Sequence, residues 1–188
     1  QNEMTIQDAL ELATKHHIQG RLPKAEQLYA RVLQEDPNQI DAIHMLGLLA
    51  HQVGKNNIAV ELISKAIEQR PGWAEAHSNL GTALRHLGRL EEAVASYRKA
   101  LALRPDFTQA HNNLGTALQG LGKLEEAIAS YGKALAIKPD YAEAHNNLGN
   151  ALKGLGELDE AVASYHKALA IEPNHAVAHN NLGNALQD

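Results

Sequence analysis

Five prolines recur at a fixed interval along the 188-residue chain, and this spacing constrains the fold more than any other feature. They stand 34 residues apart, at Pro37, Pro71, Pro105, Pro139 and Pro173. The segments between them repeat in sequence, most closely over 108–141 and 142–175. A fixed period of this length is typical of a solenoid, in which each repeat buries its apolar side against its neighbours and no single core forms.

We number the residues of each repeat from 1 to 34, so that the proline is at position 32. The chain is then a single array of successive repeats. The repeats are 6–39, 40–73, 74–107, 108–141 and 142–175, and 176–188 is the first helix of a partial sixth. The first repeat is degenerate, with Ala13 where later repeats have glycine, and we expect it to act as a cap. The last segment closely repeats the start of the fifth repeat, which favours a fragment cut from a longer array and leaves a natural cap as the alternative.

Each repeat has the pattern of a helical hairpin. Apolar residues spaced by three and four predict one helix over 142–155 and a second over about 158–171. Gly156 is expected to end the first helix in the left-handed conformation, and Pro173 to stop the second. Gly149 lies inside the first helix, where it costs about 1 kcal/mol relative to alanine. We therefore expect the second helix to approach closely at Gly149, within an all-α fold.

The residue after each proline is predicted to cap the helix that follows. These residues are Asn38, Gly72, Asp106, Asp140 and Asn174, and Asp140 with Glu143 resembles a capping box.

Composition excludes several classes of function. The formal charge of −5 argues against nucleic acid or an anionic membrane surface as a partner, and the absence of cysteine excludes disulfides and thiolate chemistry. No apolar run approaches the roughly 20 residues that cross a bilayer, and the first residues lack the apolar core of a signal peptide. We expect a soluble, cytoplasmic protein whose natural chain starts at Met4.

The pattern of a repeat resembles the tetratricopeptide repeat (TPR), which shares its period and its signature of Leu148, Gly149, Ala161, Tyr165, Ala168 and Pro173. The resemblance covers the chain from Ile6. It departs where the family often has a tryptophan early in the first helix, because histidine stands there at His77, His111, His145 and His179. The resemblance implies a right-handed superhelical solenoid. Its first helices would line a concave groove that binds peptides through positions 2, 5, 6, 9, 12 and 13 of each repeat.

Amides occupy many of these groove positions. Asparagine is a poor residue for a helix interior, whereas its carboxamide offers donors and an acceptor that match an extended peptide backbone. The row resembles the asparagine ladder in the TPR region of O-linked N-acetylglucosamine transferases, although Glu11 and Met45 interrupt it in the first two repeats. The alternative is that the amides bond to the adjacent helix and hold the stack together. The candidate peptide-binding residues are Asn79, Asn112, Asn113, Thr116, Asn146, Asn147, Asn150, Lys153, Asn180, Asn181 and Asn184.

Catalytic and metal sites are not predicted. The position-4 histidines recur once per repeat, on successive helices, which does not suit a tight zinc site, and we expect no metal or cofactor. Carboxylate pairs such as Glu125–Glu126 and Asp159–Glu160 are explained by the helix dipole at N-terminal turns. No nucleophile, base and orienting group can be assembled from these repeated positions.

The sequence therefore predicts a non-catalytic protein–protein interaction scaffold that holds an extended peptide or partner segment of unknown identity. One alternative is the substrate-recognition arm of a larger, glycosyltransferase-like enzyme whose catalytic domain is absent. A second is a scaffold that self-assembles through its C-terminal end, where Leu182 and Leu186 would be partly uncovered.

Overall fold

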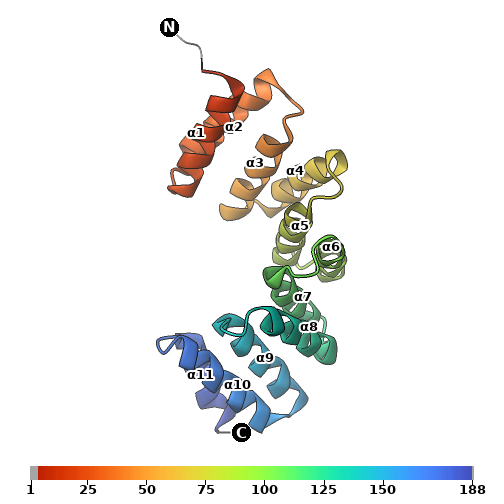
Figure 1. Cartoon of the computed structure of the whole chain (residues 1–188), viewed down its shortest axis with the longest axis vertical. Helices are drawn as coiled ribbons and strands as arrows, with labels where there is room; N and C mark the ends of the chain where they lie inside the picture. Colours follow the sequence, from red (N-terminus) through yellow and green to blue (C-terminus); the bar gives the residue numbers. More distant parts are fainter. Residues whose placement is uncertain (1–3, 188) are drawn as a thin grey trace. The chain divides into compact units, whose positions relative to one another are not determined.

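The computed structural model describes residues 4–187, and every regular element in that range is an α-helix (Figure 1). The first helices of the repeats are α1 (Ile6–Ile18), α3 (Ile40–Gln52), α5 (Ala74–His86), α7 (Thr108–Gly120), α9 (Ala142–Leu155) and α11 (Ala176–Ala185). The second helices are α2 (Leu22–Glu35), α4 (Asn56–Gln69), α6 (Leu90–Leu103), α8 (Leu124–Ile137) and α10 (Leu158–Ile171). The all-α prediction and the helix bounds expected in the fifth repeat are confirmed. The expectation for the chain start concerns residues outside the described range.

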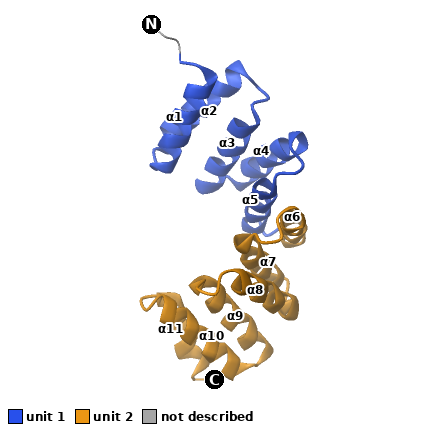
Figure 2. Cartoon of the chain, viewed as in Figure 1, with its two compact units in different colours: residues 1–89 blue, residues 90–188 orange. Residues whose placement is uncertain are grey.

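The helices form two compact units, residues 1–89 with α1 to α5 and residues 90–188 with α6 to α11 (Figure 2). In the first unit α1 packs on α2 and α3 on α4, and in the second α7 packs on α8 and α9 on α10. Small apolar side chains, mostly alanine, fill the contacts between the paired helices. None of the described helices has the length and apolar character that a membrane span requires.

Each hairpin turns at a glycine with a left-handed backbone. In the fifth repeat Gly156 has φ +83°, and the N–H of Glu157 donates to the carbonyl of Leu152 at 3.0 Å. This bond closes the end of α9 in the manner of a Schellman motif, which satisfies a carbonyl that the helix leaves open. The other hairpin glycines also have positive φ, as predicted: Gly20, Gly54, Gly88 and Gly122.

The glycine inside the first helix allows close approach of the paired helix, which confirms the prediction. A Cβ on Gly149 would lie 2.6 Å from Cε1 of Tyr165, and one on Gly115 would lie 2.6 Å from Cε1 of Tyr131. Both tyrosines are completely buried. In the second repeat the corresponding contact joins Gly47 and Ile63, at 2.8 Å. The ring therefore occupies the space that a side chain on the glycine would need.

The predicted N-caps are wrong by one residue. The helices are capped by Gln39, Trp73, Phe107, Tyr141 and His175, so Asp140 does not form a capping box with Glu143. The reason is a β-turn with the proline at its second position, a favoured place for proline. In the turn that precedes α3, the N–H of Gln39 donates to the carbonyl of Asp36 at 3.2 Å. The residue after the proline is used inside this turn, and helical geometry begins after the next residue.

The position-4 histidines hold this turn against the helix that follows it. Nε2 of His77 lies 2.8 Å from the carbonyl oxygen of Pro71, and His111 and His145 make the same contact with their own prolines. His179 repeats it with Pro173 at 2.7 Å. An imidazole N–H donating to this carbonyl gives each histidine a structural role where the family often has a tryptophan.

We predict that Gly149→Ala lowers the free energy of unfolding by about 1–3 kcal/mol, because the new methyl group collides with the buried ring of Tyr165. Gly132→Ala is the matched control, since it lies in the interior of α8 and a Cβ added there would have no neighbouring heavy atom within 4 Å. There alanine should be neutral or stabilising by up to about 1 kcal/mol. Urea unfolding monitored by circular dichroism measures both, and equal effects of the same sign would contradict the account.

Candidate functional site

Asparagines at adjacent positions of the first helices have different environments. Asn112 is completely buried and Asn146 is 4% exposed, although the sequence placed both among the peptide-facing residues. Asn113 and Asn147, one residue further on, are half-buried. The prediction for Asn112 and Asn146 is corrected: their carboxamides lie between helices, because consecutive helical residues point about 100° apart and position 5 faces the next repeat.

A diagonal hydrogen bond links position 5 of one repeat to position 6 of the next. Nδ2 of Asn147 donates to Oδ1 of Asn112 at 3.2 Å, and Nδ2 of Asn181 donates to Oδ1 of Asn146 at 3.0 Å. In the first unit Asn79 makes the same link to Nε2 of His44, at 3.2 Å. The partners are always 35 residues apart. The amides of these repeats therefore do hold the stack together.

The Asn112 carboxamide is bonded to two residues at the start of α9. Its Nδ2 donates to Oε1 of Glu143 at 3.1 Å and to the hydroxyl of Tyr141 at 3.4 Å. Burial, together with the neighbouring charge of Glu143, raises the pKa of Tyr141 to about 12. Tyr141 is therefore a neutral hydroxyl at physiological pH, which suits a structural hydrogen-bonding group.

Position 9 is bonded within its own hairpin. The buried Tyr165 hydroxyl donates to Oδ1 of Asn150 at 2.8 Å, and the Tyr131 hydroxyl lies 3.4 Å from Oγ1 of Thr116 and 2.9 Å from Oε1 of Gln119. The Asn150 bond uses its acceptor and leaves both N–H donors of a half-buried side chain for other partners.

The remaining predicted residues lie at the surface to different degrees. Lys153 is half-buried on α9, and Asn181 is half-buried on α11. Asn180 and Asn184 are exposed on α11. The structure thus separates the predicted set into residues buried in the stack and residues that a partner can reach.

The first two repeats replace the diagonal link with apolar side chains. Their position-5 and position-6 residues are Leu10 and Met45, whose side chains cannot form the hydrogen bond that two carboxamides make. A hollow of about 410 Å³ lies there, lined from α1 by Gln7, Leu10, Glu11 and Thr14, from α3 by Asp41, His44 and Met45, and by Trp73.

His44 is 4% exposed at the edge of this hollow, and its ring lies 4.1 Å from that of Trp73. Burial lowers the pKa of His44 to about 4, despite the opposing charges of Asp41 and Glu75. The imidazole is therefore neutral at physiological pH. Its Nε2 accepts from Asn79, which places the ring proton on Nδ1.

A repeated cation–aromatic pair was missed by the sequence reasoning. Arg70 lies over the ring of Trp73, with Cζ 4.6 Å from the centroid, and Arg104 lies over Phe107 at 3.7 Å. Nζ of Lys138 is 5.3 Å from the centroid of Tyr141. A basic residue three positions before an aromatic one, recurring with the 34-residue period, was the available signal. The aromatic member of each pair is the N-cap of the next helix.

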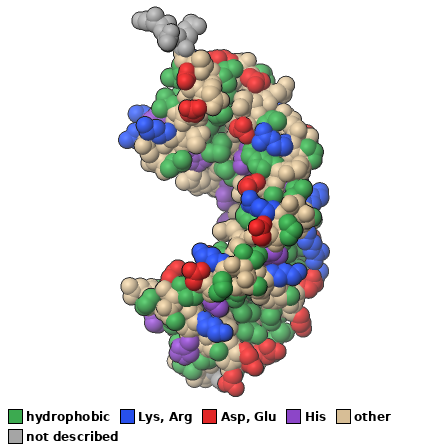
Figure 3. All heavy atoms as spheres, viewed as in Figure 1, with side chains coloured by type: hydrophobic (Ala, Val, Ile, Leu, Met, Phe, Trp, Pro, Cys, Tyr) green, Lys and Arg blue, Asp and Glu red, His purple; other side chains and the backbone are tan. Residues whose placement is uncertain are grey.

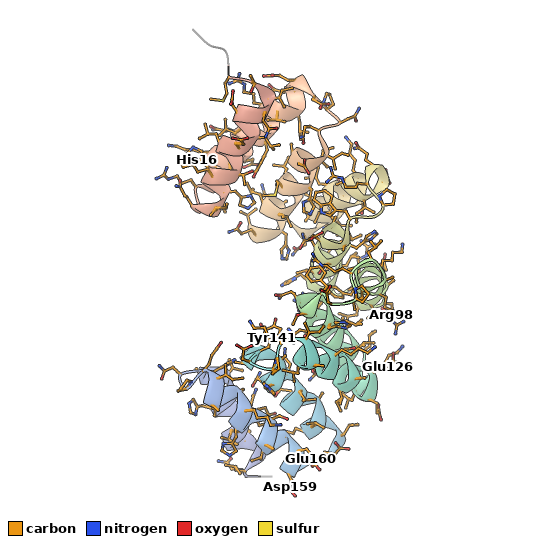
Figure 4. All side chains as sticks on the ribbon, in the orientation of Figure 1. His16, Arg98, Glu126, Tyr141, Asp159 and Glu160 are labelled. Carbon is orange, nitrogen blue, oxygen red and sulfur yellow. The ribbon has the colours of Figure 1, made fainter. Side chains whose placement is uncertain are left out.

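A second hollow, of about 760 Å³, lies between the second helices α6 and α8. Leu114 and Leu118 are among its apolar lining residues, and Arg98 and Glu126 point toward one another at its rim, 3.0 Å apart (Figure 4). Both side chains are more than half exposed, so this ion pair contributes little to stability. The hollow contains none of the predicted peptide-binding residues.

Titratable residues in the described range form no group of three or more that could hold a metal ion. Asp159 and Glu160 are exposed in the first turn of α10, where acidic side chains gather on the visible face (Figures 3 and 4). Negative charge at a helix N-terminus is stabilised by the helix dipole, so this pair has a structural explanation.

The fold and the linked amides define a helical-repeat protein, and comparisons identify which kind. Family models described as TPR repeat match residues 81–122 and 120–156, and models described as tetratricopeptide repeat match 16–84 and 142–175. The chain belongs to the tetratricopeptide repeat family. A comparison with curated proteins found no significant match.

Solved structures show the same fold. The chain is 30% identical to MamA, with a TM-score of 0.79 over 91% of this chain and 93% of MamA. It is 27% identical to TTC0263, a thermophilic TPR protein of Thermus thermophilus, with a TM-score of 0.75 over 98% of this chain and all of TTC0263. It is 23% identical to YrrB, a TPR protein described as having an unusual peptide-binding site, with a TM-score of 0.76 over 95% and 92% of the two chains.

We predict that Asn147→Ala lowers the free energy of unfolding by about 1–3 kcal/mol, because it leaves the buried Oδ1 of Asn112 without its donor. Asn180→Ala is the control, since Asn180 is exposed and should change stability by no more than about 0.5 kcal/mol. Chemical denaturation of Asn112→Ala, of Asn147→Ala and of the double variant measures the coupling energy between these two side chains. Strict additivity of the two substitutions would contradict the diagonal link.

We also predict that His44 makes stability depend on pH. Its pKa is lower in the folded chain than the usual 6.5, so the unfolded chain binds more protons in the interval between about 4 and 6.5. Stability contributed by neutral His44 is present above this interval and is lost as the pH falls through it, by up to about 3 kcal/mol. Denaturation at about pH 7 and about pH 4.5 should show a smaller loss for His44→Gln than for the wild type. An NMR titration midpoint of the His44 ring near 6.5 would refute the prediction.

Proposed function

We propose that this chain is a non-catalytic protein-interaction scaffold that binds an extended peptide segment along the first helices of its repeats. Membership of the TPR family supports a protein-interaction role, because repeats of this family commonly present a groove to partner proteins. The observation that carries the proposal is that position 6 holds a half-buried asparagine in each unit, at Asn79 in the first and at Asn113, Asn147 and Asn181 in the second.

The diagonal link leaves these amides able to bind a partner. A carboxamide offers two N–H donors and an acceptor oxygen, and the bond from Asn147 to Asn112 uses one donor. The same bond restricts the rotamers of Asn147, so less side-chain entropy is lost when a ligand binds. We infer that the buried position-5 amides position the accessible position-6 amides. In one hydrogen-bond network, the position-5 amides then support the stack and the position-6 amides bind the peptide.

Amides suit the main chain of an extended peptide. Such a chain rises about 3.3 Å per residue, and packed helices lie on the order of 10 Å apart, so amides on neighbouring first helices would meet roughly every third peptide residue. Each could accept from a backbone N–H and donate to a backbone carbonyl. Asn150, Thr116 and Lys153 would add contacts beside this row. Such recognition reads the backbone, so it tolerates many side chains.

The test uses peptides selected from a random library against the full chain. We predict that Asn113→Ala with Asn147→Ala weakens their binding about tenfold or more, since two backbone contacts are lost. Asn57→Ala is the matched control, because Asn57 is an exposed asparagine on the second helix α4. Titration calorimetry measures affinity, and circular dichroism establishes that the variants remain folded at the temperature used.

N-methylation of the peptide backbone gives an independent arm. It removes backbone N–H donors while keeping the side chains, and we expect binding to fall by a similar factor. Unchanged affinity in the double variant, together with its lower thermal stability, would show that the amides only hold the stack together. If the chain selects no peptide, the proposed function is wrong.

A further inference from the structure

The hollow between α1 and α3 differs from the contact between α7 and α9 in a way that indicates a specific occupant. Positions 5 and 6 carry Leu10 and Met45 here, whereas the equivalent positions between α7 and α9 carry the bonded pair Asn112 and Asn147. The hydrogen bond between those carboxamides joins the two helices directly. The apolar pair leaves a hollow of about 410 Å³, which is ample for one long side chain.

The walls and rim of the hollow differ in chemistry. Leu10, Met45 and Trp73 are half-buried apolar residues that line it, and Glu11 and Asp41 are its two carboxylates. No lysine or arginine is among the residues that line it. Oδ1 of Asp41 accepts from Nη1 of Arg70 at 3.3 Å, but both side chains are nearly half exposed, so this pair is weak and can be exchanged.

His44 adds a polar group to the lining of the hollow. Its ring is almost fully buried, lines the hollow and has its proton on Nδ1, because Nε2 accepts from Asn79. A peptide carbonyl at the hollow would be able to accept a hydrogen bond from this Nδ1–H.

We propose that the hollow is a specificity pocket for a long basic side chain, lysine or arginine, of the bound peptide. The aliphatic stem packs against Leu10, Met45 and Trp73, as such stems do on apolar surfaces. The cationic end reaches the carboxylates of Glu11 and Asp41. The pocket adds side-chain selectivity to a surface that otherwise reads the backbone. This inference rests on the proposed function, because the side chain belongs to a peptide bound along the first helices.

Selection and substitution test the pocket together. Peptides selected from a random library by the full chain should be enriched in one basic position. Replacing that residue by norleucine, which keeps an aliphatic stem without the charge, should weaken binding about three- to tenfold, and replacing it by glutamate should weaken it more. The Glu11→Gln with Asp41→Asn variant should lose the preference for lysine over norleucine while still binding the backbone.

A second variant tests the shape of the pocket. Leu10→Asn with Met45→Asn installs the pair found at Asn112 and Asn147, which should close the hollow and abolish the preference for any side chain at that position. Glu11→Lys with Asp41→Lys should reverse the preference from lysine to glutamate. The matched control is Glu125→Gln with Glu126→Gln, which removes two exposed carboxylates from the first turn of α8. Thermal unfolding by circular dichroism identifies variants that fail to fold.

The outcomes separate this inference from the function on which it rests. If peptides bind through the asparagines but show no basic preference, or if they favour an apolar residue that Glu11→Gln with Asp41→Asn does not affect, the specificity pocket is wrong and the proposed function stands. If no peptide is selected, both are wrong.

Discussion

The structure depends on one repeated contact, in which a glycine on the first helix of a hairpin faces a buried tyrosine on the second. At Gly149 and Tyr165 a single added methyl group would overlap the ring. This contact sets the separation of the paired helices, and it carries the Tyr165 hydroxyl through to the first-helix face, where it bonds Asn150. Core packing therefore decides which hydrogen-bonding groups of the candidate site are already used.

A second constraint acts between repeats. The diagonal bond from Asn147 to Asn112 joins successive first helices through a carboxamide that is completely buried and fully bonded. An amide in such a place stabilises only if every partner is present, since a buried polar group without one is costly. Where Leu10 and Met45 replace the pair, the link is absent and a hollow remains. The variation between repeats thus has a direct structural consequence, and it is where we expect selectivity to lie.

The sequence was sufficient for features set by local periodicity. The apolar spacing predicted α9 and α10 to their ends, and the positions of Gly149 and Gly156 predicted a close contact and a left-handed turn. The cap of α9 was misplaced because Pro139 and Asp140 belong to a turn, which makes Tyr141 the residue that precedes the helix. The resemblance to the tetratricopeptide repeat family was predicted from the same periodicity. The likeness to glycosyltransferase repeats stays a prediction.

The candidate site was only partly predictable. Asn112 and Asn147 are both on first helices, and helical periodicity places them away from the paired second helix. Whether each side chain faces solvent or the next repeat depends on how that repeat packs, which the periodicity does not give. The doubled asparagines recurring with an offset of 35 were a signal for the diagonal bond that was not used. The hollow beside Met45 could not be anticipated, because it arises from two apolar residues on different helices and from a tryptophan at the start of a third.

The central claim is that accessible amides on the first helices bind a peptide backbone while buried amides support them. A crystal structure of the chain with a selected peptide tests this most directly. The account predicts peptide backbone atoms within hydrogen-bonding distance of Asn147 and Asn150, with the bond from Asn147 to Asn112 still in place. A peptide seated instead in the hollow between α6 and α8, with the first-helix amides untouched, would contradict it.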